Sequence, residues 1–214
     1  MERPGRGAMV SAAAFGQARR GRLVVLSGPS GVGKDTVIKR LMELVPAISR
    51  PVAYTTRQPR PGERDGIEYS FISQREFLAK RDAGAFLETA TVHGNLYGTA
   101  RERVEDLRQQ GRDVLLKIDV QGASQLRSGA ADAVFIFLAP PSREVLRQRL
   151  KQRETESAPE LATRTRDAER ELEEARWYHH RVVNDEVDRA AGEIAAILYP
   201  NPDEGSSRRP ATMA

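Results

Sequence analysis

A glycine-rich loop after a short apolar run most constrains how this chain folds. Residues 23–26 (L-V-V-L) predict a buried strand, and residues 28–36 then read G-P-S-G-V-G-K-D-T. Such a loop wraps an anion with backbone N–H groups and opens onto a helix N-terminus, which favours negative charge. The pattern G-x-x-x-x-G-K-[ST] fits as far as Lys34 and fails at Asp35, where a hydroxyl would contact Mg²⁺. The loop predicts a nucleotide phosphate site beside an irregular metal site.

Lys34 is the first candidate catalytic residue. A lysine at the end of a phosphate loop reaches the β- and γ-phosphates of a bound triphosphate. The alternative is a chance match, with Lys34 on a solvated helix face. The upstream strand, the full glycine spacing and the downstream helical pattern favour the phosphate role.

The composition excludes several kinds of protein. The chain has 214 residues, 39% hydrophobic and 30% charged, which suits one globular unit with inserted subdomains. It has no cysteine, so disulfides and thiolate metal sites are excluded, and its three histidines make no convincing zinc site. No apolar stretch reaches the ~18 residues that cross a bilayer, and no secretory signal is evident. We therefore expect a cytoplasmic protein with no membrane partner.

The positive charge lies in the N-terminal tail. Residues 1–22 hold five arginines and one acid, which accounts for the whole net charge of +4. A segment rich in Gly, Ala and Arg is typical of disorder, and a weak anion-binding arm is the alternative. We expect a disordered basic tail over residues 1–21, a flexible tail over residues 201–214, and no nucleic-acid partner.

Apolar runs alternate with helical patterns in the rest of the chain, which predicts an α/β fold. Continuous apolar runs of this length are typical of a parallel sheet covered on both faces. We expect a P-loop NTPase-type parallel sheet flanked by helices. The expected strands are 23–27, 113–119, 133–138 and 181–185, and the expected helices that flank them include 34–44 and 187–199.

Two stretches interrupt the alternation. Residues 51–98 are rich in turns and aromatics, and residues 147–170 hold six arginines. Both look like insertions that cover a site on a core formed by residues 22–50, 99–146 and 171–200.

Helix boundaries can be read from caps and prolines. Capping boxes at Ser73-x-x-Glu76 and Thr99-x-x-Glu102 predict helices over 74–81 and 100–110. A long charged helical stretch begins at Arg143, and Pro159 is expected to interrupt it.

A stiff arginine–proline segment is a second phosphate-binding candidate. Residues 55–63 read T-T-R-Q-P-R-P-G-E, which places Arg57 and Arg60 three residues apart between prolines. A planar guanidinium bonds two phosphate oxygens at once. The hydroxyls of Tyr69 and Tyr97 are further candidate donors. The alternative is an ordinary surface loop.

These motifs together resemble guanylate kinase, the nucleoside monophosphate kinase that phosphorylates GMP. The resemblance runs from about Leu23 to Leu198 and rests on G-P-S-G-V-G-K, T-T-R-Q-P-R-P-G-E, D-G-I-E-Y, G-N-L-Y-G-T, I-D-V-Q-G and V-V-N-D. It implies a guanylate kinase-like domain over residues 22–200, with a GMP-binding insertion at 51–98 and a helical lid at 147–170. The implied reaction is in-line phosphoryl transfer from ATP, with Mg²⁺, to GMP and dGMP in purine nucleotide metabolism.

The resemblance also implies an acceptor site. The residues that match the family's GMP-binding positions are Arg57, Arg60, Tyr69, Glu88, Tyr97, Thr99 and Asp119. The first two and both tyrosines match contacts to the phosphate, and Thr99 matches a hydroxyl at the base. Glu88 and Asp119 match carboxylates that accept from guanine N1 and N2. Carboxylates select guanine because adenine lacks these donors, and such selection reaches ~10⁴–10⁵.

The implied donor site uses the loop and the lid. The residues that match ATP-binding positions are Gly28, Pro29, Ser30, Gly31, Val32, Gly33, Lys34, Asp35, Thr36, Arg149 and Asn184, the last two near adenine. Arg153 and Arg164 match lid arginines that reach the transferring phosphate and complete the catalytic set with Lys34. An arginine supplied to that charge is worth ~10³–10⁵ in rate, and lid closure excludes water.

Three positions depart from the family pattern. Asp35 stands where Ser or Thr is usual, Lys117 where an acid is usual, and Ala53 where Ser is usual. We hypothesise that the carboxylate has moved from the strand to the loop, so that Asp35 serves Mg²⁺ and Lys117 is its counter-charge or a phosphate contact. The alternative is drift, with Mg²⁺ held mainly by phosphates and water. Ala53 removes one hydrogen bond at the base, worth about 0.5–1.5 kcal/mol.

Two other functions stay open. One is a non-catalytic guanylate-kinase-like module that binds proteins, and the other is a related kinase of another small phosphate ester. Binding modules lack an intact ATP loop, whereas this chain keeps Lys34. Glu88 and Asp119 favour a guanine base over other phosphate esters. The sequence indicates no oligomeric state.

Overall fold

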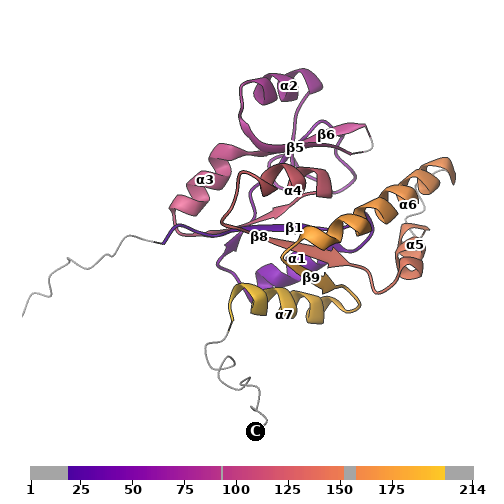
Figure 1. Cartoon of the computed structure of the whole chain (residues 1–214). Coiled ribbons are helices and arrows are strands. Elements are labelled where there is room, and N and C mark those ends of the chain that lie inside the picture. The colour runs from indigo at the N-terminus through magenta and orange to yellow at the C-terminus, as the bar shows by residue number, and fades with distance from the viewer. Residues whose placement is uncertain (1–18, 93, 152–157, 201–214) are drawn as a thin grey trace, which may run out of the picture.

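The core is a five-stranded parallel sheet with strand order β2-β7-β1-β8-β9. The computed structural model (Figure 1) describes residues 19–92, 94–151 and 158–200, with the backbone alone of 158–162 and 164. The core strands are β1 (Leu23–Ser27), β2 (Ile48–Ser49), β7 (Asp113–Lys117), β8 (Ala133–Ala139) and β9 (His180–Val183). The predicted α/β class with a parallel sheet is confirmed.

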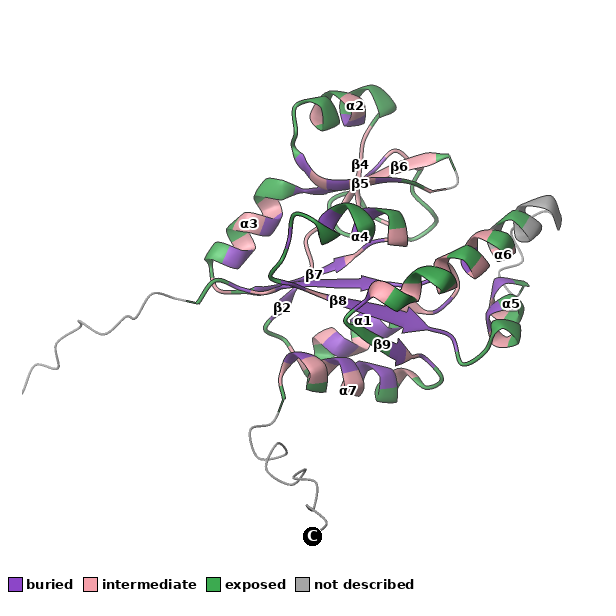
Figure 2. Cartoon of the chain, in the orientation of Figure 1, coloured by how far each residue is buried: buried purple, intermediate pink, exposed green. Residues whose placement is uncertain are grey.

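Helices cover both faces of this sheet, as Figure 1 shows. The packing follows the two-residue period of β1. Val24 and Leu26 face the helices α1 (Lys34–Leu44) and α7 (Val187–Leu198), and Leu23 and Val25 face the opposite layer. That layer contains α3 (Arg101–Gln109), α4 (Val120–Arg127) and the 3₁₀ helix η1 (Glu174–Trp177). The core strands are buried throughout their middle (Figure 2), so the sheet is a rigid base for the loops at its carboxyl edge.

A second, four-stranded sheet stands above the core (Figure 1) in the stretch where an insertion is predicted over 51–98, and its strand β6 runs on to Ala100. Its order is β4-β3-β6-β5, and its elements are β3 (Tyr54–Thr55), β4 (Ser70–Phe71), α2 (Gln74–Asp82), β5 (Phe86–Val92) and β6 (Asn95–Ala100). The rings of Phe77 and Phe86 stack with centroids 4.5 Å apart and link α2 to the sheet. The sequence expectations include none of these four strands, and β3 and β4, with two residues each, are too short to show a pattern.

One of the two predicted capping boxes is wrong. Ser73 caps α2, since its hydroxyl accepts from the Glu76 N–H at 3.2 Å. Thr99 instead lies inside β6, and α3 begins only at Arg101 with no side-chain cap. The Thr99 hydroxyl donates to the buried Glu88 Oε1 at 2.6 Å. A buried carboxylate needs this bond more than a solvent-accessible helix end does.

The charged stretch after β8 forms two helices, α5 (Arg143–Lys151) and α6 (Ala158–Glu173). Ser142 accepts from the Val145 N–H at 3.1 Å at the start of α5. Residues 152–157 between the two helices lie outside the described residues, and the stretch is interrupted next to Pro159, which lies in the first turn of α6. Proline is tolerated there because the first N–H groups of a helix have no intrahelical partner.

The ends of the described chain are tied to the core through Asp113, which is 4% exposed. Its carboxylate accepts from Arg22 Nη2 at 2.6 Å, from Arg19 Nη2 at 2.9 Å and from the Tyr199 hydroxyl at 2.7 Å. Residues 19–21 therefore already contact the core. The tail predicted over 1–21 is therefore too long at its C-terminal end, and its residues 1–18, like the tail predicted over 201–214, lie outside the described residues.

Candidate active site

A cavity of about 190 Å³ lies between the two sheets, at the carboxyl ends of β1 and β7. This is the place where an open parallel sheet binds ligands. The predicted residues that line it are Gly28, Ser30, Lys34, Tyr69, Glu88, Tyr97, Thr99 and Asp119. Two of the departing positions, Ala53 and Lys117, line it as well.

The phosphate loop closes one side of the cavity. Gly28 has φ +152°, and a Cβ there would lie 2.2 Å from the Leu138 carbonyl oxygen, so the turn requires glycine. Lys34 begins α1, and its Nζ donates to the carbonyls of Gly28 and Pro29. Burial lowers the pKa of Lys34 to about 8, and the negative charge of Glu171 is the largest effect opposing that fall.

Arg149 and Asn184 support the loop from behind. Asn184 is buried, and its Nδ2 donates to the Val32 carbonyl at 2.7 Å. Arg149 donates to the same carbonyl at 3.3 Å and to the Asn184 carbonyl at 3.2 Å. Asn184 also lies so close to the loop that a Cβ at Gly33 would approach its Nδ2 to 2.6 Å. In this structure both residues hold the loop in place.

The arginine segment meets the tyrosines at the other end of the cavity. Arg57 forms a two-bond pair with Glu63, with both distances 2.9 Å, and its Nε donates to the Tyr97 hydroxyl at 3.2 Å. The rings of Tyr69 and Tyr97 lie edge to face, 5.8 Å apart. The side chain of Arg60 is exposed and does not line the cavity. The guanidinium of Arg57, which the resemblance assigns to a phosphate, is thus paired with the carboxylate of Glu63.

Two carboxylates meet near the base-binding positions. Glu88 is 4% exposed, and burial raises its pKa to about 7. The hydrogen bond from Thr99 acts to lower this pKa, and the charge of Asp119 acts to raise it further. Asp119 caps α4, since its Oδ1 accepts from the Gly122 N–H at 2.9 Å. Burial also raises the pKa of Asp119. The pair offers acceptors in a poorly solvated place, where they bond strongly to N–H donors.

Asp35 and Lys117 are in contact, as their expected proximity requires. Lys117 Nζ donates to Asp35 Oδ1 at 2.7 Å and lies 5.3 Å from the centre of the Tyr69 ring. Desolvation acts to raise the pKa of Asp35, but the charge and hydrogen bond of Lys117 outweigh it and lower that pKa. The Lys117 side chain is 14% exposed. Because it contacts both Asp35 and Tyr69, it links the phosphate loop to the tyrosine end of the cavity.

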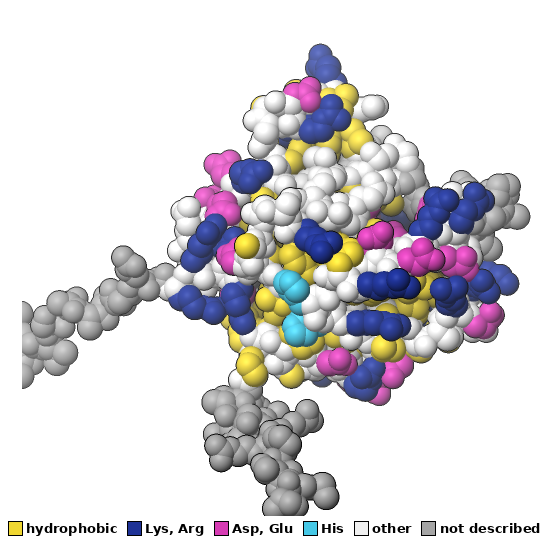
Figure 3. Space-filling model, in the orientation of Figure 1, with side chains coloured by type: hydrophobic (Ala, Val, Ile, Leu, Met, Phe, Trp, Pro, Cys, Tyr) yellow, Lys and Arg dark blue, Asp and Glu magenta, His cyan; other side chains and the backbone are white. Residues whose placement is uncertain are grey.

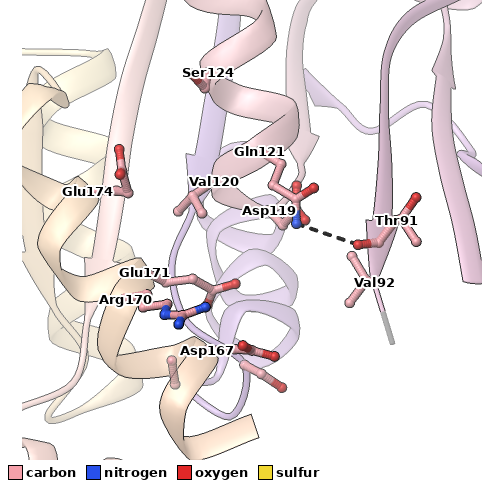
Figure 4. Close-up of a pocket in the computed structure, with 12 residues that line it drawn as sticks. Thr91, Val92, Asp119, Val120, Gln121, Ser124, Asp167, Arg170, Glu171 and Glu174 are labelled. Atoms are coloured by element: carbon pink, nitrogen blue, oxygen red, sulfur yellow. Dashed lines mark hydrogen bonds between the residues drawn. The ribbon is translucent and has the colours of Figure 1, made fainter. Parts of the chain in front are cut away.

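Sequence reasoning missed Glu171 on α6. It lines the first cavity and also an adjoining cavity of about 460 Å³ (Figure 4), where α6 and α4 form opposite walls. Its Oε2 is buried and has no hydrogen-bond partner among the described residues, and burial raises the pKa of Glu171 to about 7. The sequence carries no signal for this position, because Glu171 is one of many charges on a helical stretch.

The roles expected for the two lid arginines stay predictions, because neither side chain is among the described ones. Arg153 lies outside the described residues, and Arg164 lies on α6 with a side chain outside them. Over α5 and α6, Lys and Arg side chains alternate with acids on the face shown in Figure 3. Within the described ranges, no group of three or more His, Cys, Asp or Glu side chains could hold a metal ion, and no helix could cross a membrane.

The parallel sheet and the phosphate loop beside a cavity are the arrangement of a P-loop nucleotide kinase. The guanylate kinase family profile matches residues 20–200. The chain is 46% identical over 182 residues to a guanylate kinase from Nitratidesulfovibrio vulgaris, which covers 85% of this chain and 88% of the relative. It is 44% identical over 180 residues to one from Geobacter sulfurreducens, at 84% and 89% coverage. The crystal structure of guanylate kinase from Anaplasma phagocytophilum matches with a TM-score of 0.70 and 34% identity, covering 84% of this chain and 85% of that chain. The chain belongs to the guanylate kinase family of enzymes.

Proposed function

We propose that this protein transfers the γ-phosphoryl group of ATP to GMP or dGMP and releases ADP and the nucleoside diphosphate. The observation that carries the proposal is that one cavity holds Lys34 at its loop side and Glu88, Thr99 and Asp119 at its other side. A donor phosphate and an acceptor purine therefore fit end to end. We infer a role in cytoplasmic purine nucleotide metabolism from this reaction.

Guanine recognition rests on the two acids. Guanine N1–H and N2–H donate to Glu88 and Asp119 in their ionised forms, and the Thr99 hydroxyl keeps Glu88 oriented through its 2.6 Å bond. An adenine in the same place would leave buried acceptors without donors, which is the strongest form of rejection. Ala53 supplies no hydroxyl at this end, so the acids carry the selection.

The acceptor phosphate takes the place of Glu63. Arg57 presents two N–H groups to that carboxylate at 2.9 Å, and a phosphate offers the same pair of oxygens with more charge. Tyr97 and Tyr69 stand beside Arg57, and Arg60 approaches from the exposed loop when the phosphate is bound. The phosphate oxygen of GMP is then held for attack on the γ-phosphorus of ATP.

Phosphoryl transfer needs alignment and charge neutralisation more than covalent help. Lys34 leaves the carbonyls of Gly28 and Pro29 and bonds the β- and γ-phosphates. Arg153 and Arg164 neutralise the transferring group, while Arg149 and Asn184 hold the loop and face the adenine. Closure over the site excludes water, which would otherwise take the phosphoryl group.

The residues present fit a magnesium ion. Mg²⁺ prefers oxygen and is usually held by one or two carboxylates together with substrate phosphates and water. Asp35 offers an exposed carboxylate with a lowered pKa in the first turn after the loop. We propose that Asp35 would hold Mg²⁺ with the ATP phosphates, and that Lys117 balances its charge or contacts a phosphate. When bound, the metal would neutralise charge on the β- and γ-oxygens.

An assay for ADP release tests the proposal. Purified protein with ATP and Mg²⁺ is given GMP, dGMP, AMP or a sugar phosphate in parallel. We expect turnover with GMP and dGMP and little with AMP. Turnover with only the sugar phosphate would instead identify a kinase of another phosphate ester. A folded protein without turnover on any acceptor would identify a binding module.

A further inference from the structure

Helix α4 lies against both of the acids that we assign to guanine. Asp119 caps α4, and Glu88 lies on β5 of the other sheet. The two acids thus belong to different layers of the molecule. Their spacing depends on whatever fixes α4 against β5.

Gln125 makes the closest polar link between these elements. Its Oε1 accepts from the Thr89 N–H at 3.1 Å, and its Nε2 donates to the Thr89 carbonyl at 2.6 Å. Thr89 is the residue after Glu88, and β5 is the edge strand of its sheet. One side chain therefore pairs with both backbone groups that this edge residue would otherwise leave to solvent. Gln121 adds a longer contact, with Nε2 3.5 Å from the Thr91 carbonyl, which is drawn in Figure 4.

Gly122 allows the same helix to lie directly against the acids. A Cβ at this position would approach Glu88 Oε2 to 2.4 Å and Asp119 Oδ1 to 3.4 Å. Gly122 has a helical backbone that any residue could adopt. Glycine is needed here because the Glu88 carboxylate leaves no room for a Cβ. The Gly122 N–H is also the group that orients Asp119, at 2.9 Å.

We propose that Gln125 and Gly122 are positioning residues that set the spacing between Glu88 and Asp119, and through it the selectivity for guanine. Gln125 fixes the strand that carries Glu88, and Gly122 sets how closely the helix that carries Asp119 approaches. Neither residue needs to contact the nucleotide. The inference rests on the proposed function, because guanine is the base that this spacing fits.

The test compares Gln125→Leu with Gln125→Glu, which keeps an acceptor for the Thr89 N–H and loses the donor. The matched control is Gln109→Leu, the same change on an exposed position of α3. Activity is measured with GMP and with inosine monophosphate, which lacks the 2-amino group. For Gln125→Leu we expect the KM for GMP to rise about 5- to 20-fold, with kcat and the KM for ATP within about twofold, as for two lost hydrogen bonds. The preference for GMP over inosine monophosphate falls with it, and Gln125→Glu is intermediate.

If Gln125 had a merely structural role, its replacement would raise the KM for ATP and the KM for GMP together. An unchanged KM for GMP in Gln125→Leu, an equal rise for ATP and GMP, or an unchanged preference between the two acceptors would overturn the proposal. Gly122→Ala is the second variant, and its thermal unfolding is recorded alongside. We expect it to remain folded, because alanine favours a helix, and to lose preference for GMP. If the wild type itself ignores GMP, the proposed function fails; if it uses GMP and Gln125→Leu behaves like it, only this inference fails.

Discussion

Lys117 Nζ donates to Asp35 Oδ1 at 2.7 Å and so joins the end of β7 to the first turn of α1. The two residues are far apart in the chain and come together because β7 and β1 are neighbours in the parallel sheet. Their opposite charges partly cancel beside Lys34, whose pKa responds to both of them. The charge at the phosphate loop is therefore set by all three groups.

A double-mutant cycle tests whether Asp35 and Lys117 act as one unit. Asp35→Ser leaves the cation of Lys117 without a partner, and Lys117→Asp places two carboxylates side by side. We expect each single variant to lose at least about tenfold in kcat/KM, and the double variant to recover part of that loss, because contacting residues couple by about 0.5–3 kcal/mol. The measurement is the rate as a function of Mg²⁺ concentration. Additive effects on the rate and on Mg²⁺ dependence would show that the two sites are independent.

Glu88 predicts an acidic limit for GMP use. Its pKa is raised to about 7, mainly by burial, and only the carboxylate accepts from both guanine N–H groups. The kcat/KM for GMP is expected to fall about tenfold for each pH unit below that pKa. Glu88→Gln is expected to abolish this fall of kcat/KM at acidic pH. It also lowers kcat/KM at pH 8 by about 10²-fold, as for lost charge-assisted bonds. Glu76→Gln, an exposed change on α2, should behave as wild type.

The same shift has a consequence for folding stability. A carboxyl whose pKa is raised by folding is harder to ionise in the folded chain than in the unfolded one. Its ionisation therefore destabilises the protein at neutral and alkaline pH, and the penalty disappears as the pH falls toward the unfolded value of 4.5. We expect Glu88→Gln to unfold at a higher temperature than wild type at pH 8. Equal melting temperatures at pH 8 would contradict the raised pKa.

The strongest local signals predicted the donor side of the fold. β1 and α1 have the bounds expected from the sequence, because an apolar run, a glycine loop and a helical pattern follow one another directly. The family motifs identified Glu88, Asp119 and Tyr97 as neighbours of the same cavity. These residues carry recognisable motifs, so the resemblance could locate them.

The rest depends on contacts between distant segments. β3 and β4 exist because they pair with each other and with β6, which no local pattern reveals. The local pattern predicts that Thr99 caps a helix. That prediction fails because Thr99 bonds to Glu88, and the burial of Glu88 comes from tertiary packing. Glu171 lies at the same cavity as the phosphate loop because of the direction in which α6 runs across the molecule. Local sequence patterns predict helices, strands and loops, but they do not show which distant side chains come into contact.

Glu171 predicts an alkaline limit for ATP use. Burial lowers the pKa of Lys34 to about 8, and the charge of Glu171 is the main effect that raises it. Glu171→Gln removes that support, so the pKa of Lys34 is expected to fall further. The alkaline limb of kcat/KM for ATP, which reports the free enzyme, should then move from about pH 8 to lower pH. Glu173→Gln, exposed on the same helix, is the control, and an unmoved limb in Glu171→Gln would exclude this coupling.

Asp113 is expected to contribute to stability and not to activity. It is 4% exposed and accepts hydrogen bonds from Arg19, Arg22 and Tyr199, so Asp113→Asn removes the charge that holds both ends of the described chain. We expect a loss of about 1.5–3 kcal/mol in the free energy of unfolding at pH 7, as for a hydrogen bond to a charged group. Urea unfolding measures it, with the exposed Asp106→Asn as control.

The pH dependence of that loss checks its cause. Burial acts to raise the pKa of Asp113, but the bonds from Arg22 and Tyr199 lower it overall. A carboxyl with a lowered pKa stabilises the fold above its unfolded value and loses that contribution as the pH falls through its folded value. The difference between Asp113→Asn and wild type should therefore be full at pH 7 and shrink below the unfolded pKa of 3.8. A difference that stays constant from neutral to acidic pH would assign the loss to packing and not to the charge of Asp113.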